Sequence, residues 1–300
     1  MAKRVLAWAG GLSTLAGLSV LAYASLWERN RFTLREVIVP VLPPGSEPIR
    51  ILHLSDLHLL PHQKRKIAWI RRLGQLQPDF VVNTGDNVSS PKALPALARA
   101  LEPLQGIPGV FVNGSNDFNG PGPVNPFQYF KDERPDSAIT PLPVEAMWSL
   151  FREFGWRRAE EKRLRYTLRG STIEVRGCGD AHINADYYPL VAGAVDEDVD
   201  LLLGVTHAPY RRVLDQMVAD GAGLIIAGHT HGGQVCLPGG HALTTNCDLP
   251  SPQAKGLSMW TWGDNASFLH VSAGLGTSPY APVRMCCPPE ATLLTLTSRV

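Results

Sequence analysis

Carboxylate, amide and imidazole side chains gather in five short clusters along the 300-residue chain, each directly after an apolar run. In chain order the clusters are Asp56 with His58, Asp86, Asn116 with Asp117, His207, and His229 with His231. A mixed oxygen and nitrogen donor set suits manganese, iron or zinc better than calcium, which prefers oxygen alone. These residue types therefore predict a transition-metal site, provided that the fold brings the clusters together.

Each cluster taken alone also has an ordinary explanation. Asp56-x-His58 could belong to a surface loop, Gly85-Asp86-Asn87 could be a turn, and His207 could be a helix-capping or buried histidine. The run Gly228-His229-Thr230-His231-Gly232-Gly233 is more informative, because two imidazoles among small residues are poor core material. The occurrence of all five clusters in this order is what favours the metal site.

The apolar runs before the clusters predict the strands that would position them. These runs are residues 49–54, 80–82, 110–112, 199–205 and 224–227. Residues 63–76 and 92–104, between the first three runs, carry apolar side chains at helical spacing. Strands that alternate with helices indicate a sheet with parallel parts, and ligands gather at the carboxyl ends of such strands. All five clusters could therefore converge in space.

Further strands are predicted outside this alternating region. They are residues 32–41, two hairpins at 164–176 and 259–272, and a closing strand at 291–297. Residues 118–143 are rich in Pro, Gly and Asn and show no period. Two interpretations of that segment stay open: a lid over the site, or a surface insertion without a catalytic part.

Composition excludes several classes of protein. With 28 Lys and Arg against 27 Asp and Glu, the formal net charge is +1, which argues against binding nucleic acid mainly by phosphate neutralisation. The 28 Gly and 25 Pro are many for a helical bundle. The five cysteines cannot all pair; a Cys236–Cys247 bridge is one option, and buried free thiols are favoured.

The N-terminus predicts a membrane segment. Residues 5–27 carry no charge, and about 20 apolar residues suffice to cross a bilayer as a helix. We therefore expect residues 1–30 to be a single-pass anchor and residues 31–300 to be one catalytic domain. Ala22-Tyr23-Ala24 resembles a signal-peptidase site, so export after cleavage is an alternative, and a buried soluble helix is another. Basic residues on both sides of the run leave its orientation open.

The ordered clusters resemble the motifs of the calcineurin-like metallophosphoesterases. The resemblance runs from about Ile49 to the C-terminus, and the tail, with Ser272-Ala273-Gly274-Leu275-Gly276-Thr277, is similar to a bacterial subgroup with an N-terminal membrane segment. It implies an α/β fold in which two mixed β-sheets pack as a sandwich flanked by helices, preceded by a transmembrane helix. It also implies a centre of two divalent metal ions at one edge of the sandwich.

Position by position, the resemblance implies two overlapping sets of ligands. One metal would be held by Asp56, His58, Asp86 and His231, and the second by Asp86, an asparagine, His207 and His229. A carboxylate shared in this way holds two cations about 3.5–4 Å apart, and a water between them becomes a hydroxide that attacks phosphorus. The implied activity is hydrolysis of a phosphodiester or phosphomonoester. The expected substrate is a phosphorylated small molecule or a lipid-linked compound, with no stable nucleic-acid partner.

The third cluster departs from the family pattern, which usually reads Gly-Asn-His-Asp or Gly-Asn-His-Glu. Here it reads Gly114-Ser115-Asn116-Asp117. Aligned without a gap, Ser115 takes the ligand position; shifted by one residue, Asn116 is the ligand and Asp117 replaces the histidine. We favour the shifted alignment, because an amide oxygen is a better metal ligand than a neutral hydroxyl.

Either alignment lacks the usual imidazole near the leaving group. General-acid assistance typically contributes about 10²–10⁴-fold, so activity on poor leaving groups is in doubt. Asp117 or His182 could replace that acid, and an ordinary loop histidine is the alternative for His182. The absence also motivates a second hypothesis, a degenerate member that binds metal or a phosphorylated ligand without catalysis. Arg284 has two open roles, a phosphate contact or a structural ion pair.

Overall fold

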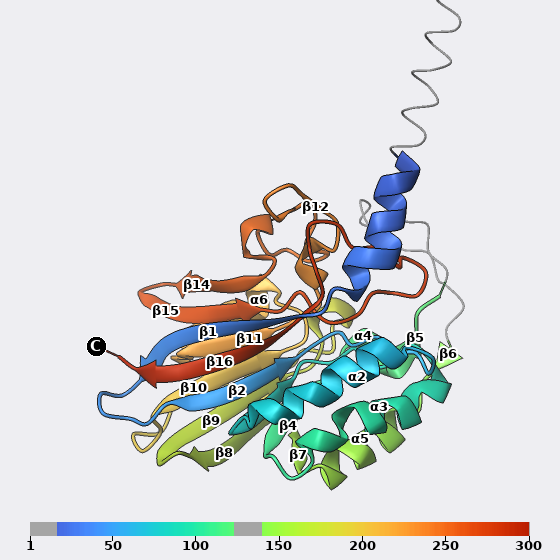
Figure 1. The fold of residues 1–300 in the computed structure, drawn as a ribbon. Coiled ribbons are helices and arrows are strands. Elements are labelled where there is room, and N and C mark those ends of the chain that lie inside the picture. The colour runs from blue at the N-terminus through green and yellow to red at the C-terminus, as the bar shows by residue number, and fades with distance from the viewer. Residues whose placement is uncertain (1–16, 123–139, 300) are drawn as a thin grey trace, which may run out of the picture.

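Two six-stranded mixed β-sheets form the centre of the protein (Figure 1). The structure, a computed structural model, describes residues 17–122 and 140–299. The first sheet has the order β1 (Thr33–Leu42), β16 (Glu290–Ser298), β2 (Ile49–Leu54), β3 (Phe80–Asn83), β4 (Gly109–Phe111) and β7 (Trp156–Arg158). The second has the order β14 (Gly256–Trp262), β15 (Asn265–Val271), β11 (Leu224–Ala227), β10 (Leu201–Thr206), β9 (Ser171–Cys178) and β8 (Lys162–Leu168).

Parallel pairing dominates at the strands that precede the polar clusters. Strands β2, β3 and β4 pair in parallel, and so do β10 and β11. The two predicted hairpins are confirmed, because β8 with β9 and β14 with β15 are antiparallel. The carboxyl ends of the parallel strands therefore meet at one end of each sheet.

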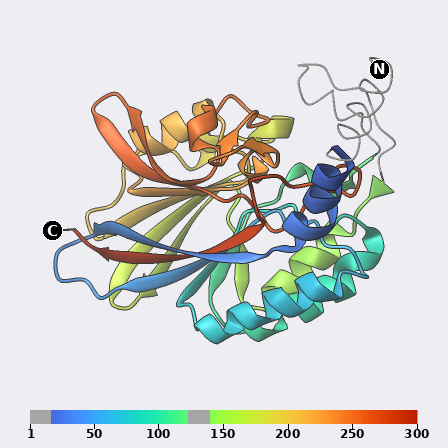
Figure 2. The same cartoon turned by 45° about the horizontal axis from the view of Figure 1, so that its top comes forward.

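Helices cover the outer faces of both sheets. The α-helices of the domain are α2 (Lys64–Arg72), α3 (Leu94–Leu101), α4 (Ser115–Phe118), α5 (Val144–Glu153) and α6 (Arg211–Ala219). Helices α2, α3 and α5 pack on the first sheet, and α6 packs on the second (Figures 1 and 2). Short 3-10 turns follow α2 at Leu73–Leu76 and flank α3 at Pro91–Ala93 and Glu102–Leu104. The predicted helices 63–76 and 92–104 are thus present, with ends wound more tightly.

The two layers on either side of each sheet explain why the predicted strands are mostly apolar. In β2, Ile49 and Ile51 face the other sheet, whereas Leu52 and Leu54 face the helices. Successive side chains of a strand point to opposite faces, so a strand covered on both sides is apolar at most positions. The expected α/β fold with two mixed sheets packed as a sandwich is confirmed.

The remaining described elements are short and lie in loops. They are the 3-10 or π turns Tyr23–Trp27, Glu28–Asn30, Ala181–Ile183, Tyr188–Leu190, His231–Gly233 and Ser251–Gln253, and the strands β5 (Asn119–Gly120), β6 (Thr140–Pro141), β12 (Cys236–Leu237) and β13 (His241–Ala242). Most of the segment 118–143 falls outside the described residues, so the choice between lid and insertion stays a prediction. All five cysteines are free thiols, so no Cys236–Cys247 bridge forms.

The N-terminal membrane segment is only partly within the described residues. Residues 1–16 of the predicted span 5–27 lie outside them. Among residues 17–122 and 140–299, no helix has both the length and the apolar character that a membrane crossing requires.

Candidate metal centre

All five polar clusters meet at one end of the sandwich (Figure 1). Asp56 and His58 follow β2, Asp86 follows β3, and α4 follows β4. The remaining imidazoles come from the other sheet, after β10 and β11. The predicted convergence is therefore a property of the structure, and the site draws its side chains from both sheets.

The backbone at the proposed ligands is unusual. Asp56, His58, Asp86, His229 and His231 all have left-handed conformations, with φ between 39° and 67°. Such conformations cost non-glycine residues about 1–3 kcal/mol each and persist where surrounding structure holds them. Hydrogen bonds between the loops do so here: Asp56 N donates to Gly85 O at 2.9 Å and His58 N donates to Asp86 O at 2.9 Å. No sequence pattern indicated this clustering of strained residues.

The side chains form two overlapping groups. Asp56, His58 and His231 form one, and Asp56, Asp86 and His207 form the other, with their donor atoms within 4.8 Å of one another. Asp86 Oδ2 lies 3.4 Å from His58 Nε2 and 3.7 Å from His207 Nε2. One carboxylate oxygen thus lies between an imidazole of each group.

Two buried atoms of this site have no hydrogen-bond partner among the described residues: Asp56 Oδ1 and His207 Nε2. A buried polar atom left unpaired costs about 1–3 kcal/mol. In addition, His58 Nε2 and His231 Nε2 face each other at 3.2 Å. A cation would give all four atoms a partner, so the residues present fit a divalent metal.

The four histidines are each oriented through the ring nitrogen that would not bind metal. His58 Nδ1 contacts Ser89 Oγ at 3.2 Å, and His207 Nδ1 contacts Thr84 O at 2.6 Å. His231 Nδ1 lies 3.2 Å from Gly276 O, and His229 Nε2 lies 3.1 Å from Asn246 O. Metal-binding histidines usually donate their second N–H in this way. The arrangement leaves Nε2 of three rings, and Nδ1 of His229, to face a metal.

His229 belongs to neither group of closely spaced donors. Its ring centroid lies 5.2 Å from that of His207, and its backbone N donates to Asp56 Oδ2 at 3.0 Å. The structure therefore places His229 beside the site, and its role as a ligand stays a proposal.

The pKa values of the buried groups at this site are shifted in opposite directions. Burial would lower the pKa of His207, but the carboxylates of Asp86, Asp180 and Asp56 outweigh it and raise that pKa to about 10. Burial raises the pKa of Asp86 to about 7, against the attraction of His207. Burial also acts to raise the pKa of Asp56, yet the imidazoles of His231, His207 and His58 hold it well below its usual range. Opposite shifts in adjacent carboxylates are typical of functional sites.

The third cluster brings Asn116, rather than Ser115, to the site. Asn116 donates to Asp86 twice, from its backbone N to Oδ1 at 2.9 Å and from Nδ2 to Oδ2 at 2.8 Å. Turning the amide by 180° would present its oxygen to a cation held by Asp86. Ser115 instead donates its backbone N to Asp180 Oδ2 at 2.9 Å. This geometry supports the shifted alignment.

Asp117 is fully buried beside the proposed ligand Asp86. Its carboxylate accepts from the backbone N–H groups of Asp86 at 2.8 Å, Asn87 at 2.7 Å and Gly114 at 3.0 Å. These contacts occupy both oxygens and tie the Asp86 loop to the start of α4. They suit a positioning residue better than a proton donor to substrate.

His182 lies at the edge of the site. Its ring centroid is 4.4 Å from that of His229, and its Nδ1 lies 3.0 Å from Tyr210 Oη. Asp180 accepts from the backbone N of both His182 and Ser115, so it joins the two loops. Of the two replacement acids considered from the sequence, His182 is therefore the partly exposed one beside a proposed ligand.

A buried chain of polar side chains, absent from the sequence analysis, leads from the core to Asp56. Ser55 Oγ donates to Asp56 Oδ2 at 2.5 Å, and Thr84 Oγ1 donates to Ser55 Oγ at 2.6 Å. His53 Nε2 lies 2.9 Å from Thr84 Oγ1, and the Nδ1 atoms of His53 and His270 lie 3.1 Å apart across the sheets. The carboxylate only accepts, so each group donates toward Asp56. The only sequence signal is the presence of His53 within an otherwise mostly apolar run.

Replacing Ser55 by alanine is expected to weaken metal binding by about 10–100-fold, the usual effect of removing a group that orients a ligand. The variant would lose the donor that fixes Asp56 Oδ2. Metal titration by calorimetry measures the effect, with Ser149→Ala, an exposed hydroxyl on α5, as the control. Equal metal affinities of the Ser55 and Ser149 variants would show that this series of hydrogen bonds does not orient Asp56.

Arg284 has neither of the roles considered from the sequence. Its side chain is fully buried, and its Nη2 donates to Ala273 O at 2.7 Å, Gly274 O at 3.1 Å and Gly276 O at 2.7 Å. Because Gly276 O also contacts His231, Arg284 supports a proposed ligand from behind. It makes no ion pair within the described residues.

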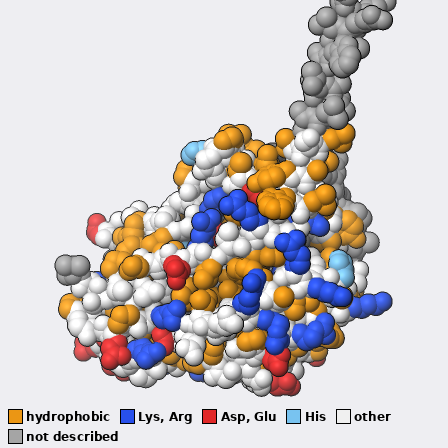
Figure 3. Space-filling view, viewed as in Figure 1, with side chains coloured by type: hydrophobic (Ala, Val, Ile, Leu, Met, Phe, Trp, Pro, Cys, Tyr) orange, Lys and Arg blue, Asp and Glu red, His pale blue; other side chains and the backbone are white. Residues whose placement is uncertain are grey.

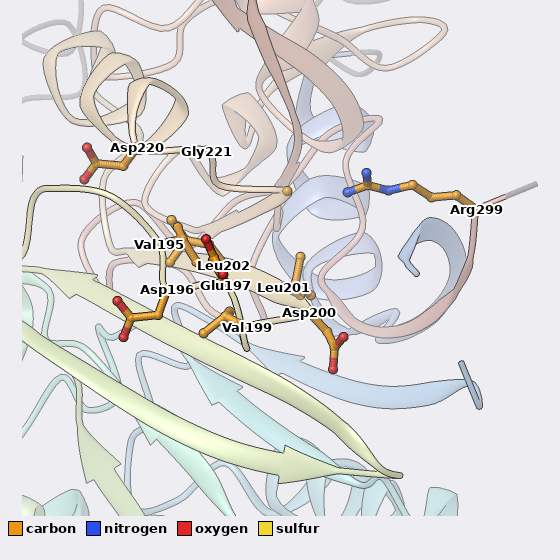
Figure 4. A pocket seen from close by; sticks show the side chains of 11 residues that line it. Val195, Asp196, Glu197, Val199, Asp200, Leu201, Leu202, Asp220, Gly221 and Arg299 are labelled. Carbon is orange, nitrogen blue, oxygen red and sulfur yellow. The ribbon is translucent and has the colours of Figure 1, made fainter. Parts of the chain in front are cut away.

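A cavity of about 310 Å³ lies elsewhere, between the loop before β10 and the start of β11 (Figure 4). Asp196, Glu197 and Asp200 line it together with Arg299. None of the proposed ligands lines this cavity, so it is separate from the metal centre.

Comparison with known proteins agrees with this geometry. The profile of the family described as calcineurin-like phosphoesterase matches residues 49–233, a span that contains every proposed ligand. The chain is 24% identical over 302 residues to YkuE, a metallophosphoesterase of Bacillus subtilis, covering 97% of this chain and 93% of YkuE. It is 25% identical over 257 residues to YpbG of the same organism, covering 84% and 82%. It is also 26% identical over 300 residues to a Bos taurus transmembrane protein with a metallophosphoesterase domain, covering 93% of this chain and 60% of that protein. The chain belongs to the calcineurin-like phosphoesterase family.

Proposed function

We propose that this protein is a hydrolase that cleaves phosphodiesters or phosphomonoesters at a centre of two divalent metal ions. The observation that carries the proposal is the pair of buried atoms without a hydrogen bond among the described residues, Asp56 Oδ1 and His207 Nε2, beside histidines whose other ring nitrogen is already held. Buried polar atoms without hydrogen bonds destabilise a fold, and this set of oxygen and nitrogen donors suits manganese, iron or zinc.

The proposed division of ligands is the one that the family resemblance implies, and the two closely spaced groups of donors supply five of its seven residues. Asp56, His58 and His231 hold one ion, His207, Asn116 and His229 hold the other, and Asp86 is shared. Bound there, the two ions supply an activated water nucleophile and positive charge for the phosphoryl oxygens. Asp117 holds the Asp86 loop, and His182 is positioned to hold a proton near the leaving group.

We also propose that residues 1–30 attach the domain to a membrane, with export after signal cleavage as the alternative. The uncharged run 5–27 supports attachment, and one relative is named a transmembrane protein. Phosphorylated small molecules and lipid-linked phosphoesters are both compatible with an attached enzyme.

The second candidate function is a metal-binding protein without catalysis. It is motivated by Ser115 and by the missing histidine in the third cluster. His182 beside His229 is the observation that favours an enzyme over this alternative.

The test combines metal counting with kinetics. Full-length protein in detergent is titrated with Mn²⁺ or Zn²⁺, and hydrolysis of an aryl phosphate and an aryl phosphodiester is followed. We expect two ions per chain and turnover that rises with occupancy. Full occupancy without hydrolysis of either activated ester would favour the non-catalytic alternative.

A further inference from the structure

Exposed apolar side chains surround the described end of the N-terminal segment. On residues 17–30 they are Leu18, Val20, Leu21, Tyr23, Leu26 and Trp27. The last two are the most exposed, at 70% and 67%. Contiguous exposed apolar surface usually marks an interaction site.

This segment is fixed to the catalytic domain at the loop 281–287. Cys287 N donates to Glu28 Oε1 at 2.6 Å, and Arg284 N donates to Ala24 O at 3.1 Å. Arg29 Nη1 also reaches Pro282 O at 3.3 Å. The segment therefore leaves the domain at a defined place, at the end of the sandwich that holds α4 (Figure 1).

Strand β12 lies on the other side of the same loop. Cys236 N donates to Met285 O at 2.8 Å, and Met285 N donates to Gln234 O at 3.0 Å. Three segments distant in sequence thus lie side by side. The exposed apolar residues of these loops are Val235, Leu237, Leu243 and Tyr280. We call these four residues the apolar rim.

The apolar rim is directly connected to the metal centre. Val235 follows the proposed ligand His231 by four residues, and β12 pairs with β13, which leads to Asn246, the partner of His229. His231 is itself partly open, with 16% of its side chain exposed. A surface that covers the rim would therefore lie close to the exposed part of His231.

We propose that the apolar rim rests on a lipid bilayer and that the substrate is a phosphorylated amphiphile presented at the membrane surface. The uncharged sequence that begins at residue 5 continues into the exposed segment 17–30, so the bilayer is the occupant that continues this surface. Arg29 and Arg31 lie at the C-terminal end of this exposed segment, and their charge complements anionic headgroups. Figure 3 shows hydrophobic side chains with lysines and arginines beside them over this part of the domain.

This inference rests on the proposed function. Comparing lipid substrates with soluble ones tests the inference and the proposed function separately. Full-length protein is reconstituted with Mn²⁺ in vesicles of phosphatidylcholine that contain phosphatidic acid, a monoester, and phosphatidylglycerol, a diester. Hydrolysis of these lipids is compared with hydrolysis of soluble aryl phosphate and aryl phosphodiester. We expect turnover of at least one lipid.

The decisive variant is Leu237→Glu with Leu243→Glu, which places charge in the apolar rim. We expect it to lower lipid hydrolysis by about tenfold, with aryl ester hydrolysis unchanged within about twofold. The matched control is Ile38→Glu with Met259→Glu, two exposed apolar residues on β1 and β14 outside the rim, and it should leave both activities unchanged.

Several results would overturn the inference. Turnover of aryl esters without turnover of either lipid would refute the substrate class while leaving the proposed function intact. An equal loss on both kinds of substrate, or no loss on lipid, would refute the role of the rim. A dimer in light scattering that the rim variant dissociates, with lipid hydrolysis unchanged, would assign the rim to a second copy instead. No turnover of any ester would remove the proposed function, and the inference with it.

Discussion

Replacing Asp86 by asparagine is expected to lower the rate of phosphoester hydrolysis by about 10³-fold or more. Asp86 Oδ2 lies between His58 and His207, so its charge is shared by both halves of the proposed centre. An amide of the same shape keeps a neutral oxygen but loses the charge that holds two cations together. Metal content should fall together with turnover.

The same variant should remain folded. Asparagine keeps the shape of the side chain, and its amide oxygen can still accept the hydrogen bond that Asn116 N donates at 2.9 Å. Circular dichroism melting and metal analysis check both expectations. The control is Asp79→Asn, a carboxylate that accepts from Arg50 N before β3, away from the site. Turnover in the Asp86 variant equal to that of the control would refute the dinuclear assignment.

Replacing Gly114 by alanine is expected to abolish tight metal binding and hydrolysis. A Cβ at this position would overlap Asp86 Oδ1 and lie 2.6 and 2.7 Å from Cε1 and Nε2 of His207. The φ of Gly114 is −98°, which any residue adopts, so the effect would come from contact and not from backbone strain. Overpacking of this kind costs about 1–3 kcal/mol of stability, and a metal centre tolerates smaller displacements than a fold does.

Gly120→Ala is the matched control for this variant. Its Cβ would meet its nearest neighbours at 3.4–3.7 Å, which is ordinary contact. Calorimetric metal titration, steady-state hydrolysis and thermal melting are compared for the two variants. If both bound metal equally, Asp86 and His207 would not form the site as described.

The strands and their polar ends were predictable from local pattern alone. Residues 49–54 form β2 as expected, and residues 224–227 form β11. Strands buried on both faces are apolar at most positions, so the end of each strand is marked by the cluster of polar residues that follows it. Because β2 and β3 are parallel neighbours, the polar residues at their carboxyl ends, Asp56 and Asp86, are expected to lie together from local pattern alone. His229 follows β11 of the other sheet, so its approach to them depends on how the two sheets pack.

The residues that hold the ligands were not predictable in the same way. Thr84, His53 and His270 form a chain to Asp56 that crosses between the two sheets. Neither the spacing nor the chemistry of these three residues marks them as partners, since His53 and His270 are 217 residues apart. The burial of Arg284 was also undetermined, because arginines are mostly exposed and no local pattern pairs its side chain with the carbonyls of Ala273 and Gly276, which lie earlier in the same loop.

By itself, the sequence determined the kinds of donor, their order and their attachment to strand ends, because those features depend on residue type and on periods of a few residues. The tertiary structure decided which atoms face each other: Asn116 rather than Ser115 at Asp86, Asp117 as a support of the ligand loop, and an apolar rim next to His231. These outcomes depend on contacts between distant segments, and only the packing of the two sheets and their loops sets those contacts.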